Sequence, residues 1–137
     1  SGSQNTIEYI TIASAGNATD FGDLTSKRGY SAACSSPTIA IFAGDLNTSI
    51  GSSENTIDYV TIASTGNATD FGDLTSAKSN IAGASSSTRG VFAGGQSPAI
   101  NVIQYVTIAS VGNAVDFGDL SGASQGMGGC SNAHGGL

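Results

Sequence analysis

The stretch NTIDYVTIASTGNATDFGDL, residues 55–74, recurs with few changes at two other places in the chain. The other copies are NTIEYITIASAGNATDFGDL at residues 5–24 and NVIQYVTIASVGNAVDFGDL at residues 101–120. Self-similarity at a spacing of roughly 50 residues is typical of proteins built from repeated supersecondary units. The sequence therefore predicts one repeat domain over residues 1–137, with units at about residues 5–54, 55–100 and 101–137, the last of them incomplete.

Each unit is expected to contain four short strands. In the second unit, residues 57–63 alternate in polarity and are rich in β-branched and aromatic side chains, which favours a strand. The other strands are expected at residues 68–74, 81–85 and 89–94. No segment shows the 3.6-residue apolar period that a helix of ten or more residues requires. The pattern predicts an all-β fold with about twelve strands.

The second repeat spacing is shorter than the first. The difference falls between residues 45–54 of the first unit and the shorter counterpart at residues 95–100. Insertions are tolerated best in exposed loops, so both segments are predicted to be loops.

The charge and hydropathy of the chain exclude two classes of partner. The net charge is −6, and the four basic residues form no patch that could neutralise phosphates, so we expect no nucleic-acid binding. The longest apolar runs are far too short to span a bilayer, and we expect no membrane insertion.

Each unit carries the tripeptide Asp-Phe-Gly, which in protein kinases positions magnesium. The kinase interpretation fails because the chain has neither the Gly-rich loop with its strand Lys nor the His-Arg-Asp loop. The neighbouring acids could instead serve as calcium ligands, but two carboxylates per unit are fewer oxygens than Ca²⁺ needs. We expect no cofactor or metal, and interpret these acids as turn caps: Asp20 and Asp23, Asp70 and Asp73, Asp116 and Asp119.

Cys34 and Cys130 are the only cysteines, and they occupy the same position in two units, with Ala84 at that position in the unit between them. We expect two buried thiols at this position. Neither has the nearby Cys and His residues of a zinc site.

The chain lacks the residues of a hydrolytic active site. His134 is the only histidine, and no Gly-x-Ser-x-Gly motif accompanies the many serines. The acids are periodic, so they would line a rim instead of converging on one glycosidic bond. We expect no enzymatic activity.

A ligand site is expected where the copies disagree, because repeats conserve shape while their loops bind. The candidate binding residues are Lys27, Arg28, Tyr30, Lys78, Asn80, Arg89 and His134.

The order of motifs resembles the kelch-like β-propeller family. The stretch Val91-Phe92-Ala93-Gly94-Gly95 is similar to the end of the second strand of a kelch blade, and Tyr105 and Phe117 fall where the third and fourth strands carry aromatics. The resemblance implies four-stranded blades, with one blade split between the two ends of the chain. A β-solenoid or fibre is the alternative fold, because short polar strands specify their pairing weakly.

Three blades do not close a ring, since propellers have four to eight. The resemblance therefore implies either self-association or neighbouring blades of a longer chain. One large apolar residue per blade is expected at the contact with the next blade, and eight of the nine aromatics fall at equivalent positions: Tyr9, Tyr59 and Tyr105; Phe21, Phe71 and Phe117; Phe42 and Phe92.

Tandem units of this kind are also similar to repeat arrays in virion and tail-fibre-like proteins of bacteriophages. That resemblance implies a non-catalytic structural or adhesive module, extracellular or virion-associated, used for assembly or for binding a host surface. Its partner there would be a surface glycan or protein. The alternative is a carbohydrate-binding or calcium-stabilised lectin-like propeller.

Overall fold

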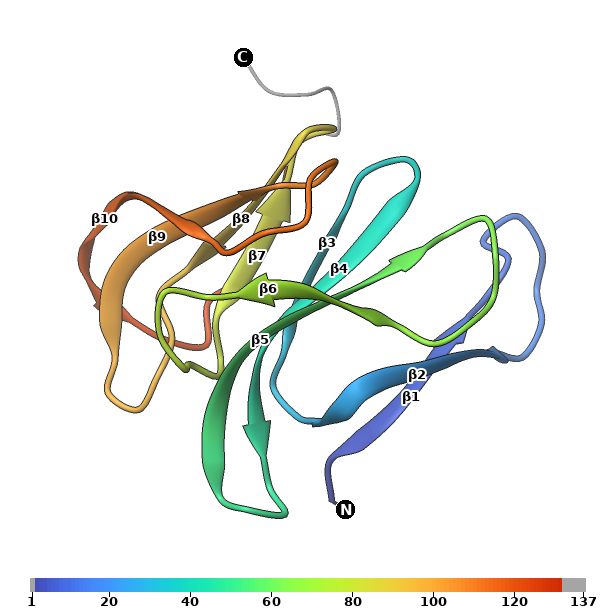
Figure 1. Cartoon of the computed structure of the whole chain (residues 1–137), viewed down its shortest axis with the longest axis horizontal. Helices are drawn as coiled ribbons and strands as arrows, with labels where there is room; N and C mark the ends of the chain where they lie inside the picture. Colours follow the sequence, from blue (N-terminus) through green and yellow to red (C-terminus); the bar gives the residue numbers. More distant parts are fainter. Residues whose placement is uncertain (1, 132–137) are drawn as a thin grey trace.

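The computed structural model describes residues 2–131, which form ten strands in three antiparallel sheets (Figure 1). The first sheet pairs β1 (Gln4–Tyr9) with β2 (Thr19–Arg28). The second contains β3 (Ala32–Ser35), β4 (Ile39–Asn47), β5 (Ser52–Thr61) and β6 (Thr69–Asp73). The third contains β7 (Ala82–Ser85), β8 (Arg89–Ala93), β9 (Ile100–Thr107) and β10 (Val115–Ser124). The all-β prediction is confirmed.

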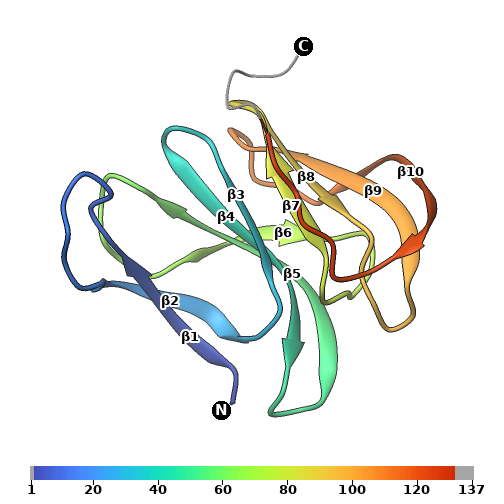
Figure 2. The same ribbon diagram turned by 180° about the vertical axis from the view of Figure 1, so that it is seen from behind.

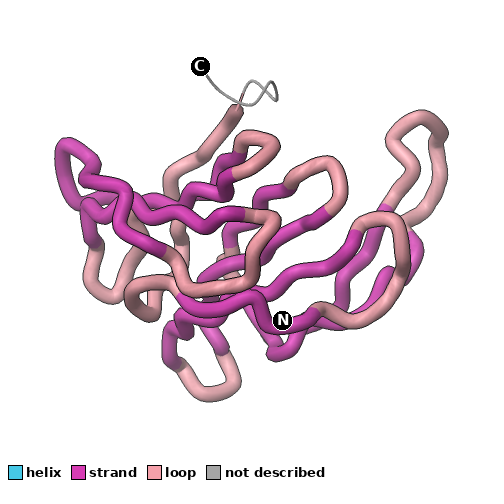
Figure 3. The backbone as a smooth tube through the Cα atoms, turned by 45° about the horizontal axis from the view of Figure 1, so that its top comes forward, coloured by secondary structure: helices cyan, strands magenta, loops and turns pink. Residues whose placement is uncertain are grey.

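Within each of the two larger sheets, the strands lie side by side in the order in which they occur in the chain. The strands of the second sheet span residues 32–73, so this sheet crosses the boundary between the first and second sequence units. In Figures 1 and 2 the second sheet lies between the other two. Figure 3 shows strands joined by loops, and the described residues contain no helix that could cross a membrane.

The Asp-Phe-Gly tripeptide forms a β-bulge. The pairing register shifts beside this tripeptide in all three sheets. Gly22, Gly72 and Gly118 have φ of 146°, 143° and 148°, a conformation that favours glycine. The preceding aspartates accept hydrogen bonds from these glycine amides at 3.0–3.2 Å. These contacts agree with the interpretation of Asp20, Asp70 and Asp116 as turn caps.

The hydrophobic core lies between the second and third sheets. Its fully buried members include Ile41 on β4, Ile57 on β5 and Phe92 on β8. Every second side chain of a strand points to the same face of the sheet, so a few apolar residues from each strand are enough to build the core. Small side chains let the sheets approach closely: a Cβ on Gly83 would lie 2.9 Å from the Ala33 carbonyl oxygen.

Two strand predictions are wrong. Residues 45–54 are not a loop, because β4 and β5 pair there through Asp45 with Glu54 and Asn47 with Ser52. The extra residues of the first unit therefore lengthen a hairpin. The counterpart of the 81–85 strand, expected in the third unit around Gly128, Gly129 and Cys130, is not formed, since no described segment pairs with these residues. The twelfth expected strand falls outside the described residues.

The prediction of two buried thiols is wrong for Cys130. Both cysteines are free, but Cys34 is half-buried and Cys130 is exposed. Cys34 lies under β8, where a Cβ added to Gly90 would stand 2.7 Å from its Sγ. Burial raises the pKa of the Cys34 thiol to about 12. Among the described residues no strand covers Cys130 in the same way.

Candidate functional site

The candidate functional site is the contact between successive sheets, which the chain makes twice. We call the contact of the first and second sheets the first junction. There β2 pairs with the loop between β5 and β6: the Gly66 amide donates to the Phe21 carbonyl at 2.7 Å, and the Ala68 amide to the Asp23 carbonyl at 2.8 Å. The side chain of Asn67 accepts a hydrogen bond from the Asp23 amide at 3.0 Å.

The second junction, between the second and third sheets, repeats these bonds. The Gly112 amide donates to the Phe71 carbonyl and the Ala114 amide to the Asp73 carbonyl, both at 2.8 Å. The Asn113 side chain accepts from the Asp73 amide at 3.0 Å. Backbone groups supply most of these contacts. All three loops have the sequence Gly-Asn-Ala, so each can form the same hydrogen bonds to a neighbouring sheet.

A buried polar cluster lies deeper in the first junction. The amide and hydroxyl of Thr25 donate to the Asp58 carboxylate at 2.9 and 2.8 Å. Arg28 forms an ion pair with the same carboxylate at 2.7 Å, and both side chains are almost completely buried. Arg28 also donates to the Thr56 carbonyl at 2.9 Å. The charge on Asp58 is therefore paired and hydrogen-bonded, as a buried carboxylate requires.

The same place in the second junction holds a neutral acceptor. Gln104 is fully buried, and its side-chain oxygen accepts from the amide and hydroxyl of Thr75 at 2.8 and 3.1 Å. No hydrogen bond joins Lys78, the counterpart of Arg28, to Gln104. Its ammonium donates instead to the carbonyls of Ser97 and Pro98 at 3.3 and 3.1 Å.

A second buried carboxylate, Asp45, lies beside the first junction on β4. Its Oδ1 accepts a hydrogen bond from the Gly29 amide at 3.3 Å. Burial, together with the nearby Glu54 carboxylate, raises the pKa of the Asp45 carboxyl to about 6, although the Gly29 amide and Arg28 act in the opposite direction. Gly95 occupies this position in the third sheet.

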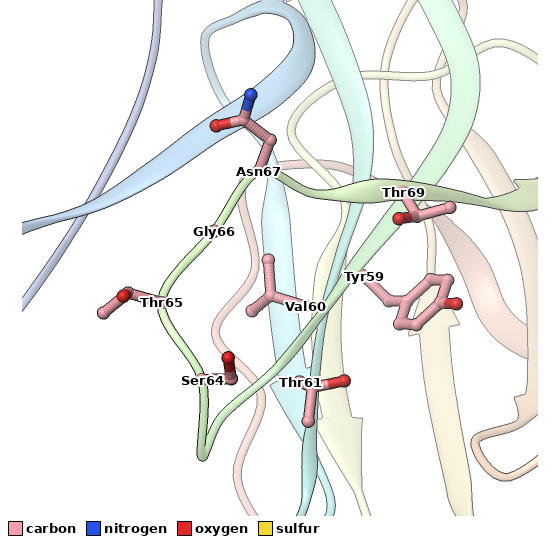
Figure 4. Close-up of a pocket in the computed structure, with 8 residues that line it drawn as sticks. All are labelled: Tyr59, Val60, Thr61, Ser64, Thr65, Gly66, Asn67 and Thr69. Atoms are coloured by element: carbon pink, nitrogen blue, oxygen red, sulfur yellow. The ribbon is translucent and has the colours of Figure 1, made fainter.

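Each junction leaves a shallow pocket in the hairpin that makes it. Residues 66–68 hydrogen-bond to β2, and β5 pairs with β6 only up to Tyr59 and Thr69, so the two arms of the hairpin separate. In Figure 4, Val60 and Ser64 point into the space between the arms, whereas the Tyr59 ring lies on the opposite side of β5. The pocket measures about 340 Å³.

The β9–β10 hairpin has an equivalent pocket of about 400 Å³. Tyr105 and Asn113 there correspond to Tyr59 and Asn67 of the first pocket. The second pocket has Val111 and Val115 where the first has Thr65 and Thr69. In addition, the Arg89 guanidinium stacks 4.6 Å from the centre of the Tyr105 ring.

The predicted binding residues do not converge on one place. Arg28 and Lys78 are buried in the two junctions, where their charged groups already have protein partners. Tyr30 and Asn80 are brought together by a hydrogen bond from the Asn80 amide to the Tyr30 carbonyl, at 3.1 Å. Lys27 is exposed on β2.

Arg89 stacks on Tyr105, and His134 lies outside the described residues. The sequence analysis missed the acceptors Asp58 and Gln104. The sequence did contain a signal for them. Asp58 and Gln104 each lie two positions before an apolar residue, so the polar and apolar side chains point to the same face of the strand, and the first unit has Glu8 at this position.

The described residues contain no group of three or more His, Cys, Asp or Glu side chains that could hold a metal ion. No protein-family model matches the chain, and no curated protein is significantly similar to it. The feature that the structure repeats most closely is the junction between successive sheets.

Proposed function

We propose that the chain is a non-catalytic structural and adhesive module of a β-propeller, displayed on a virion or cell surface and used for assembly or host-surface binding. The duplicated junction carries the proposal. Its repeated polar groups hydrogen-bond to the neighbouring sheet at both places, which supports a role in stacking sheets. Surface display is supported by the resemblance of the repeats to bacteriophage arrays.

Adhesion without turnover is testable with the purified chain. We expect it to bind intact bacterial cells or their extracted surface polysaccharide in biolayer interferometry, and to release no reducing ends from the same polysaccharide. Polysaccharide hydrolysis would contradict the non-catalytic assignment. Absence of binding across a panel of bacterial surfaces would contradict the adhesive one.

A lectin-like function is the second candidate, and the two hairpin pockets favour it. Each is lined by hydroxyl and amide groups, which are groups that contact sugars through hydrogen bonds. The side-chain nitrogen of Asn67 is not used in the junction, where only its oxygen accepts a bond.

Filling both pockets separates the two candidates. Ser64 and Ser110 are exposed and line the equivalent pockets, so the double variant Ser64→Trp/Ser110→Trp should remain folded. If the pockets bind sugar, this variant loses glycan-array binding that a Ser49→Trp control keeps. A calcium-stabilised form would also melt at a lower temperature in chelator.

A further inference from the structure

The two outer sheets each expose one half of the junction. On the first sheet, β1 and the loop after it carry the groups that correspond to Asp58 and the 66–68 loop. We call this the upstream face: Glu8, Ile10, Gly16, Asn17 and Ala18. On the third sheet, β10 carries the groups that correspond to Phe21, Asp23 and Thr25. We call this the downstream face: Phe117, Gly118, Asp119 and Ser121.

Burial shows that both faces lack a covering sheet. Phe21 and Phe71 are 9% and 3% exposed because the next sheet covers them, whereas Phe117 is 56% exposed. Ile10 is 60% exposed, while its counterparts Val60 and Val106 are 6% and 2% exposed. The apolar residues that seal each internal junction are thus present, and uncovered, on the two outer faces.

The backbone of the downstream face already has the shape that receives a loop. Cβ atoms added to Gly22 and Gly72 would collide with the carbonyls of Gly66 and Gly112, because the next loop lies directly over them. Gly118 has the same bulge conformation, with φ of 148°, but no atom of residues 2–131 outside its chain neighbours lies within 4 Å of its Cβ position. The space that a loop fills at each internal junction is open at Gly118.

The polar groups of the two faces are complementary. Glu8 has the length of Gln104, and Ser121 has the hydroxyl of Thr75, so their contact can reproduce the bonds of the second junction. The 16–18 loop, Gly-Asn-Ala, is identical to the 66–68 loop, which hydrogen-bonds to Phe21 and Asp23.

We propose that the upstream face of one copy of this chain docks on the downstream face of a second copy, reproducing the internal junction between molecules. The proposal rests on the structural role given above and names its partner. Gly16 and Ala18 amides donate to the Phe117 and Asp119 carbonyls, and the Ser121 amide and hydroxyl donate to Glu8. The contact joins two different faces, so it builds a ring when it closes and a longer array when it does not.

Light scattering after size-exclusion chromatography, supported by native mass spectrometry, tests the proposal on the 137-residue chain. We expect species at whole multiples of 13.4 kDa that dissociate on dilution. Ala18→Arg places a large charged group in the contact and should leave only monomer. Ser49→Arg, an exposed substitution in the β4–β5 turn, should associate like the parent chain.

Smaller changes test the individual bonds. Asn17→Ala removes one neutral hydrogen bond and should weaken association about fivefold. Glu8→Gln copies Gln104 and should strengthen association, because Ser124 stands where Arg28 does and leaves the Glu8 carboxylate without a counter-ion. A strictly monomeric parent chain at high concentration, or association that Ala18→Arg leaves unchanged, overturns the proposal.

Mixing two defective variants tests the head-to-tail geometry. Phe117→Arg disables the downstream face only, and Ala18→Arg the upstream face only. Each alone should be monomeric, but a mixture should form a one-to-one heterodimer through the remaining intact pair of faces. Failure of the mixture to pair, with circular dichroism showing both variants folded, overturns the geometry.

The surface-binding assay separates this proposal from the function proposed above. Retained surface binding by monomeric Ala18→Arg shows that adhesion does not need docking. A parent chain that associates but binds no bacterial surface supports the docking and contradicts only the adhesive function.

Discussion

The two junctions share their donors and differ in the charge of their acceptor. In the first, Thr25 donates to Asp58, and Arg28 neutralises that carboxylate at 2.7 Å. In the second, Thr75 donates to the neutral Gln104, and Lys78 donates to carbonyls elsewhere. The hydrogen-bonded acceptor is therefore the shared requirement, and the ion pair is a consequence of using a carboxylate as that acceptor.

The largest expected effect comes from leaving the Asp58 charge unpaired. Arg28→Met should destabilise the chain by about 3–5 kcal/mol, because it leaves a buried carboxylate without its counter-ion. Urea unfolding followed by circular dichroism measures this loss. The double variant Arg28→Met/Asp58→Gln makes the acceptor neutral, as in the second junction, and should recover most of the stability. A double variant as unstable as Arg28→Met would show that the guanidinium contributes more than charge neutralisation.

The next largest effect is the difference in stability between truncating Phe71, which is covered by a neighbouring sheet, and truncating Phe117, which is not. Phe71→Ala should cost about 3 kcal/mol, because the side chain is buried under the third sheet and packs edge-on against Tyr59. Phe117→Ala should cost less than about 1 kcal/mol at concentrations where the chain is monomeric, since that ring is mostly exposed. Equal losses for the two variants would contradict the exposure difference.

A smaller effect comes from the threonine hydroxyls. Thr75→Val keeps the backbone bond to Gln104 and removes the hydroxyl bond, so it should cost about 1 kcal/mol. Thr25→Val should cost more, because its hydroxyl donates to a charged acceptor. The difference between the two urea midpoints measures the effect of acceptor charge, and the opposite order would contradict it.

A further prediction concerns the pH profile. The folded pKa of Asp45, about 6, lies above its ordinary value of 3.8, so the folded chain holds this proton more tightly than the unfolded chain does. The contribution of Asp45 is therefore fully present below pH 3.8 and is lost as the pH rises to about 6. Asp45→Asn should flatten stability over this window and raise the urea midpoint at pH 7. An unchanged profile would assign the pH dependence to other groups.

The repeats allowed much of the local structure to be predicted. The alternation in residues 57–63 identified the core of β5. The aspartates predicted as turn caps accept a hydrogen bond from the glycine amide of each Asp-Phe-Gly bulge, as the Asp70 bond to Gly72 shows. The hairpin at residues 45–54 was missed because the length difference between the units was interpreted as an insertion in an exposed loop. Two paired strands satisfy the backbone groups of these residues equally well, and pairing depends on the partner strand.

The sequence by itself determined the repeat, the strand content and the glycine at each bulge, because these depend on periodicity and on local φ preference. The tertiary structure alone decided what each repeated residue does. Phe71 and Phe117 occupy equivalent positions, as do Cys34 and Cys130, yet one member of each pair is covered and the other exposed. Burial depends on the neighbouring sheet, and three nearly identical copies encode identical local structure whether or not that neighbour is present.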